Sequence, residues 1–198
     1  MPPHPSAISP HPSTGGLPPV IGFAGRAGAG KTTAALCLVA TMGYCLMSFA
    51  DPLRDMLRAV GLTAEDLSAG KEIPHLLLGG KTPRFALQTL GTEWGRKTIS
   101  EELWIGLARH RLNRALDAGE RIVFDDVRFA NEAQMVRVIG GIVIHIDRPG
   151  LPPISQAHAS EAGLPAQLID HHVSADSPEE LQTKLHAILN SHPSGVAA

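Results

Sequence analysis

The sequence predicts an α/β fold in three layers, with helices on both faces of a mainly parallel central sheet of about five strands. Two observations predict it. Short apolar segments alternate with helical segments along the chain, and a glycine-rich turn joins the first apolar segment to the first helix. Parallel strands are connected by crossovers that usually contain a helix, so this alternation covers both faces of the sheet.

The composition is that of a single globular domain. The chain has 198 residues, of which 43% are hydrophobic and 18% are charged, and its formal net charge is −2. The hydrophobic content excludes wholesale disorder, and the lack of positive charge argues against a general nucleic-acid or membrane-surface binder. Cys37 and Cys45 lie in apolar runs and cannot form a disulfide framework. The N-terminus shows no secretory signal pattern, so we expect a cytoplasmic protein.

The first two predicted strands flank the first predicted helix. Residues 19–24 (PVIGFA) and 44–50 (YCLMSFA) are apolar strands, and residues 30–42 are helical. Residues 32–50 carry no charge over a length close to the roughly 20 residues that a membrane-spanning helix needs. Gly43 interrupts this run, so a soluble helix followed by a buried strand explains it better and no membrane contact is expected.

The second predicted helix covers residues 51–60. Asp51 is its expected N-cap, and Pro52 occupies the first helical position, where a missing N–H costs no hydrogen bond. Residues 62–81 are irregular and punctuated by glycines. We expect a mobile insertion at this place.

The middle of the chain predicts two helices, then a strand and a helix. Residues 82–98 and 100–118 are helical, each with a Ser or Thr cap, and Gly119 ends the second helix. Residues 122–124 form a short strand, and residues 131–139 form the next helix.

The last elements complete the alternation. Residues 141–146 (GIVIHI) are an apolar strand, residues 172–174 are a weaker strand candidate, and a helix capped at Ser177 ends near Asn190.

The domain boundaries follow from composition. Residues 1–18 are rich in proline and carry no charged side chain, which is typical of a disordered arm. Residues 19–190 form the predicted domain, and residues 191–198 are a short tail.

Residues 25–32 (GRAGAGKT) match the phosphate-binding pattern G-x-x-x-x-G-K-[ST] and lie between a predicted strand and a predicted helix. Glycines let several backbone N–H groups converge on an anion at the helix N-terminus. Lys31 supplies a positive charge to the β- and γ-phosphates, and the Thr32 hydroxyl is placed to coordinate Mg²⁺. The predicted ATP-binding residues of this turn are Gly25, Ala27, Gly28, Ala29, Gly30, Lys31, Thr32 and Thr33.

Asp125 and Asp126 follow an apolar strand and are the candidate carboxylates for the Mg²⁺ shell. Adjacent strand residues point to opposite faces, so we expect one of the two to face the metal together with Thr32. The other is then free to cap the helix near Asn131.

Several arginines at predicted loop or helix-terminal positions indicate the kind of acceptor. A transfer between two phosphates gathers negative charges, and forked guanidinium groups suit their neutralisation. A phosphate acceptor is already deprotonated and needs no general base. The late strand ends without the N-K-x-D element of guanine-specific GTPases. The arginines considered are Arg26, Arg54, Arg84, Arg96, Arg128 and Arg148, whereas Arg109, Arg111 and Arg114 are better explained as surface residues.

Taken with these features, the chain resembles the phage-type deoxynucleoside monophosphate kinases, which have the P-loop kinase fold. The resemblance rests on residues 25–32, which form the P-loop of this family, and on six further segments: 49–54 (FADPLR), 87–96 (LQTLGTEWGR), 103–104 (LW), 126–132 (DVRFANE), 148–150 (RPG) and 158–161 (HASE). It implies transfer of the γ-phosphoryl of ATP to a deoxynucleoside monophosphate, with Mg²⁺ as the metal. It also implies small-molecule partners, and a host cytoplasm if the chain is phage-encoded. A homodimer is open.

The resemblance implies roles for individual residues. The residues expected to act in the transfer are Lys31, Arg26, Arg128 and Asp51. The residues expected to contact the acceptor are Asp51, Arg84, Gln88, Glu93, Arg96, Trp104 and Arg128. Arg148 and the segment to about Leu168 are the expected lid over ATP, organised by His158, Ser160 and Glu161.

Several of these roles have structural alternatives. Asp51 is equally well explained as a helix N-cap. Glu93 contacts the sugar or base, or forms an ion pair with Arg96 three residues later, which we favour. Trp94 and Trp104 stack on a base or belong to the core, and core is the commoner role. His145, His171 and His172 lack metal-ligand spacing and are read as structural.

Two other functions remain open at this point. One is a P-loop kinase for another phosphorylated metabolite, such as phosphomevalonate or dephospho-coenzyme A. The other is a regulatory P-loop NTPase, which needs fewer arginines than this chain presents.

Overall fold

The fold was analysed in a computed structural model that describes residues 16–151 and 163–192. Five parallel strands form one sheet in the order β2-β3-β1-β4-β5. The strands are β1 (Val20–Ala24), β2 (Tyr44–Met47), β3 (Arg121–Phe124), β4 (Ile142–Asp147) and β5 (His171–Ser174). The predicted parallel sheet of about five strands is confirmed.

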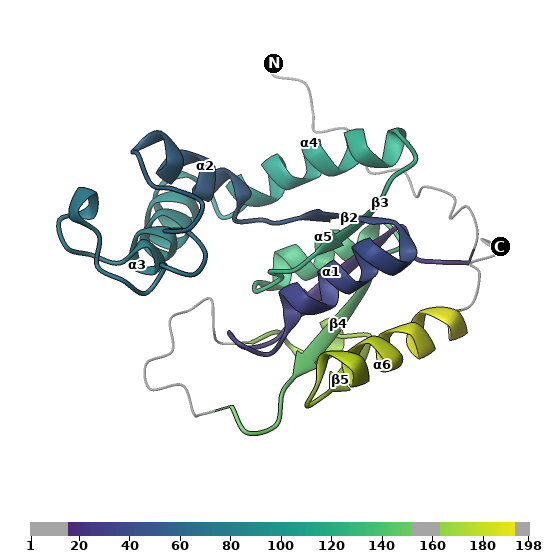
Figure 1. The fold of residues 1–198 in the computed structure, drawn as a ribbon. Helices are drawn as coiled ribbons and strands as arrows, with labels where there is room; N and C mark the ends of the chain where they lie inside the picture. Colours follow the sequence, from purple (N-terminus) through teal and green to yellow (C-terminus); the bar gives the residue numbers. More distant parts are fainter. Residues whose placement is uncertain (1–15, 152–162, 193–198) are drawn as a thin grey trace, which may run out of the picture.

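Helices cover both faces of the sheet (Figure 1). On one face, α1 (Lys31–Met42) and α6 (Pro178–Ser191) pack through residues such as Leu38 and Leu185. On the other face, α4 (Leu103–Asp117) and α5 (Ala130–Val138) bury Leu112 and Val136. The predicted three-layer α/β arrangement is confirmed.

A smaller group of elements projects beyond the carboxyl end of β2, on the left of Figure 1. It contains α2 (Asp51–Ala59), the short 3₁₀ turn Leu76–Leu78, α3 (Pro83–Gln88) and a π-helix, Thr89–Ile99. In the irregular segment 62–81, Leu62 and Leu67 are buried against Leu57 of α2. This group forms one wall of the site described below.

Three predicted elements differ from the structure by more than one residue at a boundary. The strand predicted to reach residue 50 ends at Met47, because the backbone N–H groups of Phe49 and Ala50 bond to a carboxylate instead of a neighbouring strand. The predicted helix 82–98 divides into α3 and the π-helix. The helix predicted from residue 100 begins at Leu103, because residues 101 and 102 form a turn after the π-helix.

The predicted helix caps are correct at two positions and wrong at two. Thr82 accepts a hydrogen bond from the Phe85 N–H, and Ser177 accepts one from the Glu180 N–H. Asp51 is the first helical residue and Ala50 is the N-cap, because the chain turns into helical geometry one residue early. Ser100 does not cap α4.

Among the described residues, no helix is long and apolar enough to cross a membrane. Most of the proposed arm, residues 1–15, lies outside the described residues, as do residues 152–162 of the proposed lid and residues 193–198 of the tail.

Candidate active site

The loop between β1 and α1 has the backbone that its glycines predict. Gly25, Gly28 and Gly30 have φ values of 129°, 81° and 99°, in the region that side-chain-bearing residues rarely adopt. At Gly25, a Cβ atom would lie 2.1 Å from the backbone oxygen of Ile146. The tight turn therefore depends on glycine for both conformation and space.

Lys31 lies over this loop at the start of α1. Its Nζ donates hydrogen bonds to the carbonyl oxygens of Gly25 and Arg26, each at 2.7 Å. The ammonium group is thus held beside the turn where the helix N-terminus favours negative charge. This geometry fits a phosphate cradle.

Three oxygen-bearing side chains meet beside the cradle. The Thr32 hydroxyl donates to Asp125 Oδ2 at 2.7 Å, and the Ser48 hydroxyl donates to Asp125 Oδ1 at 2.6 Å. Within residues 16–151 and 163–192, no three His, Cys, Asp or Glu side chains form a metal-binding group. A hydroxyl and one carboxylate nevertheless fit Mg²⁺, which keeps several waters and takes few protein ligands beside substrate phosphates.

Asp126 has a different set of partners from Asp125. Its two carboxylate oxygens accept the N–H groups of Phe49 at 2.9 Å and Ala50 at 3.0 Å. Burial, followed by the neighbouring Asp125 charge, raises the pKa of Asp126. The two adjacent carboxylates therefore diverge: Asp125 faces Thr32, and Asp126 fixes the turn between β2 and α2.

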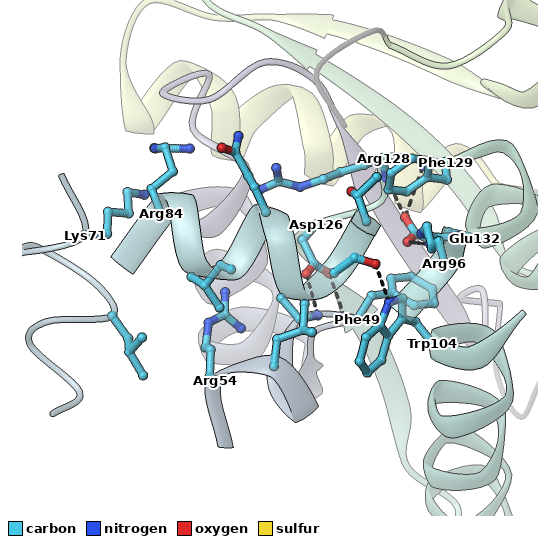
Figure 2. Close-up of a pocket in the computed structure, with 17 residues that line it drawn as sticks. Phe49, Arg54, Lys71, Arg84, Arg96, Trp104, Asp126, Arg128, Phe129 and Glu132 are labelled. Atoms are coloured by element: carbon cyan, nitrogen blue, oxygen red, sulfur yellow. Dashed lines mark hydrogen bonds and ion pairs between the residues drawn. The ribbon is translucent and has the colours of Figure 1, made fainter. Parts of the chain in front are cut away.

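A second pocket, of about 140 Å³, lies among α2, α3, the π-helix, α4 and the loop between β3 and α5. We call it the cationic pocket because five of its lining residues are basic: Arg54, Lys71, Arg84, Arg96 and Arg128. Its acidic lining residues are Asp126 and Glu132. In Figure 2, Lys71 and Arg84 lie on one side of the view, and Arg96 and Glu132 lie on the other.

The cationic pocket brings like charges close together. The pKa of Lys71 is lowered, first by burial and next by the charge of Arg84, with smaller effects from Arg128 and Arg54. The neighbouring guanidinium groups disfavour the Lys71 charge, and a bound polyanion would stabilise it. The arrangement fits a phosphorylated ligand.

Arg96 is anchored on one side of the cationic pocket. Its Nη2 donates to Glu132 Oε1 at 2.5 Å, and its Nη1 donates to the Glu101 carbonyl oxygen at 3.0 Å. Its guanidinium carbon lies 3.9 Å from the centre of the Phe129 ring. Glu132 also accepts the N–H groups of Arg128 at 2.7 Å and Phe129 at 3.1 Å. Burial is the main cause that raises the pKa of Glu132, to about 7.

Trp104 closes another wall. It is 4% exposed, and its Nε1 donates to the Gly91 carbonyl oxygen at 2.8 Å. At Gly95, a Cβ atom would lie 2.3 Å from the indole ring. Trp104 is therefore a buried core residue that also lines the pocket, whereas Trp94 is 41% exposed.

Known proteins with similar sequences indicate the family of this chain. The model of the deoxynucleotide monophosphate kinase family matches residues 82–185. A relative from Acanthamoeba polyphaga mimivirus with the same family name is 35% identical over 159 residues, which cover 73% of this chain and 81% of the relative. The chain belongs to the deoxynucleotide monophosphate kinase family. It is a P-loop kinase, as the sequence resemblance indicates.

Two phage relatives match shorter parts. The deoxynucleoside-5′-monophosphate kinase of Escherichia phage T5 is 33% identical over 100 residues, or 46% of this chain and 38% of that protein. The deoxynucleotide monophosphate kinase of Escherichia phage RB69 is 32% identical over 108 residues, or 54% of this chain and 44% of that protein. The region matched by the family model includes most residues of the cationic pocket but not the glycine-rich turn.

The structure of this family member brings many of the predicted residues into two neighbouring sites. Arg84, Gln88, Arg96, Trp104 and Arg128 line the cationic pocket. The glycine-rich turn comprises Gly25, Arg26, Ala27, Gly28, Ala29 and Gly30, followed by Lys31, Thr32 and Thr33 on α1. Arg26 is half-buried in the turn, and its carbonyl oxygen receives the Ala29 N–H as well as the Lys31 ammonium.

Three predicted residues lie elsewhere. Asp51 is not among the residues that line the cationic pocket; it pairs with Arg54 and Arg111, each at 3.0 Å. Arg148 is exposed, and it does not line the pocket either. Glu93 is exposed on the π-helix and also lies outside the pocket lining.

The predicted ion pair between Glu93 and Arg96 is wrong. Glu93 pairs with Lys97 at 2.8 Å, and Arg96 pairs with Glu132. The prediction assumed α-helical geometry, in which residues three apart are neighbours, but a π-helix bonds residue i to i+5 and turns Arg96 inward.

Only the two ends of the proposed lid, residues 148–151 and 163–168, lie within the described residues. Leu151 packs against the α1–α6 side of the core, and its side chain would lie 3.5 Å from a Cβ atom at Gly28. The segment therefore leaves the sheet beside the glycine-rich turn. His158, Ser160 and Glu161, the predicted organising residues, lie outside the described residues.

Sequence reasoning missed several residues of the two sites. Lys71 lies in the segment that was expected to be a mobile insertion, and no sequence pattern indicated its contact with Arg84. Glu132 was part of the family resemblance but had no assigned role. Ser48 was read only as part of a strand. A hydrophilic residue at the end of an apolar strand is the signal that could have indicated Ser48.

Proposed function

We propose that the chain transfers the γ-phosphoryl group of ATP to a deoxynucleoside monophosphate, giving a deoxynucleoside diphosphate and ADP. The observation that carries the proposal is the presence of two different anion-binding arrangements, the glycine-rich turn with Lys31 and the cationic pocket. Both border the loop after β3, where Asp125 faces Thr32 of the first and Asp126 lines the second. A kinase that transfers a phosphoryl group from one phosphorylated substrate to another needs two such sites side by side.

The donor side consists of the turn, Lys31, Thr32 and Asp125. We assign the triphosphate to the backbone N–H groups of the turn, and its β- and γ-phosphates to Lys31. Thr32 and Asp125 would hold Mg²⁺, which supplies charge neutralisation between the phosphates when bound. Arg26, Thr33 and Arg148 are proposed as further ATP contacts, with Arg148 at the start of the lid.

The acceptor side is the cationic pocket. We assign the acceptor phosphate to Arg54, Lys71, Arg84 and Arg128, which would orient it toward the donor. Gln88 can pair with a base edge, and the Trp104 ring forms an apolar wall beside it. An acceptor phosphate oxygen is already deprotonated, so the arrangement works by positioning and charge neutralisation. Asp51 then acts indirectly, because it pairs with Arg54.

The cationic pocket also bears on the two other functions. A regulatory NTPase that transfers phosphate to water has no use for a second basic pocket. A kinase of a phosphorylated metabolite that has no base, such as phosphomevalonate, would use the basic groups but not an amide and an aromatic wall beside them. The family membership favours the deoxynucleotide.

The test is ADP release from ATP and Mg²⁺ with a panel of deoxynucleoside monophosphates, phosphomevalonate and dephospho-coenzyme A. We expect at least one deoxynucleotide to raise ADP release more than tenfold above the rate without acceptor, and Lys31→Ala to abolish it. Stimulation by phosphomevalonate or dephospho-coenzyme A but by no deoxynucleotide, or hydrolysis that no acceptor changes, would contradict the proposal.

A further inference from the structure

Glu132 is a buried acid that touches two walls of the cationic pocket. It is 3% exposed and lies in the first turn of α5. Oε1 accepts the Arg96 guanidinium at 2.5 Å, and Oε2 accepts the backbone N–H groups of Arg128 at 2.7 Å and Phe129 at 3.1 Å. One carboxylate therefore joins the π-helix to the loop after β3.

These contacts fix groups that face the ligand. The backbone of Arg128 is held by Glu132, while the Arg128 side chain lines the cavity. Phe129, whose N–H also bonds to Glu132, lies against the Arg96 guanidinium at 3.9 Å from its ring centre. Figure 2 shows Glu132 beside Arg96, and displacing its carboxylate would remove the ion pair to Arg96 and the hydrogen bond to the Arg128 backbone.

We propose that Glu132 is a positioning residue for the acceptor: it acts through Arg128, which binds the acceptor phosphate, and through Arg96, whose guanidinium it fixes in the adjoining wall of the pocket. The inference rests on the proposed function, because it assigns the acceptor to the cationic pocket. It predicts a loss that is specific to the acceptor, since the carboxylate of Glu132 bonds to Arg96, Arg128 and Phe129 on the acceptor side.

Two substitutions of Glu132 test the contacts of its carboxylate. Both oxygens of Glu132 are acceptors, so Glu132→Gln keeps the size but turns an amide donor toward other donors on one side. Glu132→Asp keeps the charge but is shorter by one methylene group, so its oxygens cannot reach the Arg96 guanidinium and the two N–H groups together. Glu120→Gln is the control, because Glu120 is an exposed acid just before the amino end of β3, outside the pocket lining.

The experiment measures KM for the best deoxynucleotide and KM for ATP in the full chain and the three variants, with folding checked by thermal unfolding. We expect both Glu132 variants to raise the acceptor KM about tenfold or more, to change the ATP KM less than twofold, and Glu120→Gln to match the parent. The proposal is overturned if a folded Glu132 variant keeps its acceptor KM within twofold, or if both KM values rise equally.

Folding failure is also informative. If Glu132→Gln does not fold, Glu132→Asp decides; if neither folds, Glu132 serves the fold as a whole and the proposal is overturned. A parent chain that phosphorylates no deoxynucleotide would instead contradict the proposed function, which separates the two failures.

Discussion

At the scale of single residues, Asp125 and Asp126 show how adjacent carboxylates divide two tasks. Asp125 accepts hydroxyl groups from Thr32 and Ser48, whereas Asp126 accepts two backbone N–H groups from the turn before α2. The two residues are adjacent in sequence, but the Asp125 side chain points toward α1 and the Asp126 side chain points toward the turn before α2. We propose that the Asp125 contacts serve Mg²⁺ binding, whereas the Asp126 contacts fix the turn before α2.

This division predicts that two matched substitutions change different properties, the Mg²⁺ requirement in one case and the stability of the fold in the other. Asp125→Asn should raise the Mg²⁺ concentration for half-maximal rate about tenfold or more, because a charged metal ligand is lost. Asp126→Asn should lower the free energy of unfolding by about 1–3 kcal/mol, because an amide donor would face a backbone N–H. Magnesium titration of the rate and denaturant unfolding measure the two effects. An unchanged magnesium requirement in Asp125→Asn would remove it from the metal site.

Lys71 illustrates a residue whose contribution to binding opposes its contribution to stability. Its charge is disfavoured by burial and by Arg84, so Lys71→Met should leave the melting temperature unchanged or raise it. The same variant should raise the acceptor KM about tenfold, because one of the cations for the phosphate is lost. A lower melting temperature with an unchanged acceptor KM would contradict this account.

At the scale of elements, the π-helix Thr89–Ile99 explains why part of the site was not predictable from sequence. The capping residue Thr82 indicated where the helical segment begins, but no local pattern indicated that α-helical bonding would give way at Thr89. The change in period turns Arg96 inward toward Glu132 and leaves Glu93 exposed beside Lys97. Side-chain pairing therefore depended on a geometry that tertiary packing determines.

The close approach between the π-helix and α4 makes a further prediction. Gly95→Ala should lower the free energy of unfolding by about 1–3 kcal/mol and raise the acceptor KM, because the new Cβ atom would overlap Trp104. Gly106→Ala, on α4, is the control: nothing lies within 4 Å of its Cβ position, so it should be neutral or stabilising by up to about 1 kcal/mol. Equal effects of the two substitutions would show that the indole contact does not restrict the π-helix.

At the scale of the whole molecule, the sequence predicted the layer structure and the strand and helix on either side of the glycine-rich turn. The alternation of apolar strands with helices and the strand–turn–helix setting of residues 25–32 are local patterns, and both are present in the structure. The cationic pocket is assembled from five separate segments, so its membership depends on long-range packing. Arg84 and Arg128 were predicted from the family resemblance, but Lys71 became visible only when the segment 62–81 was seen packed beside them.

Glu132, the buried acid of the cationic pocket, also makes the stability of the fold depend on pH. Burial raises the pKa of Glu132 from 4.5 to about 7, against the opposing charge of Arg96, with Asp126 raising it further. A raised carboxyl pKa means that the folded state binds the proton more tightly than the unfolded state. The resulting stabilisation of the folded state is complete below pH 4.5 and is lost as pH rises to about 7.

The measurement is the difference in unfolding free energy between the parent chain and Glu132→Gln as a function of pH. The parent should lose about 3 kcal/mol relative to the variant across that window and little above pH 8. A difference that does not change with pH would show that Arg96 and the backbone donors keep Glu132 ionised throughout.

The central claim is that one molecule holds two phosphorylated substrates so that a phosphoryl group passes directly between them. It is tested most directly by following ATP labelled at the γ-phosphate in the presence of Mg²⁺ and a deoxynucleoside monophosphate. The account predicts that the label appears in the deoxynucleoside diphosphate. Label found only in inorganic phosphate, with the monophosphate unchanged, would contradict it.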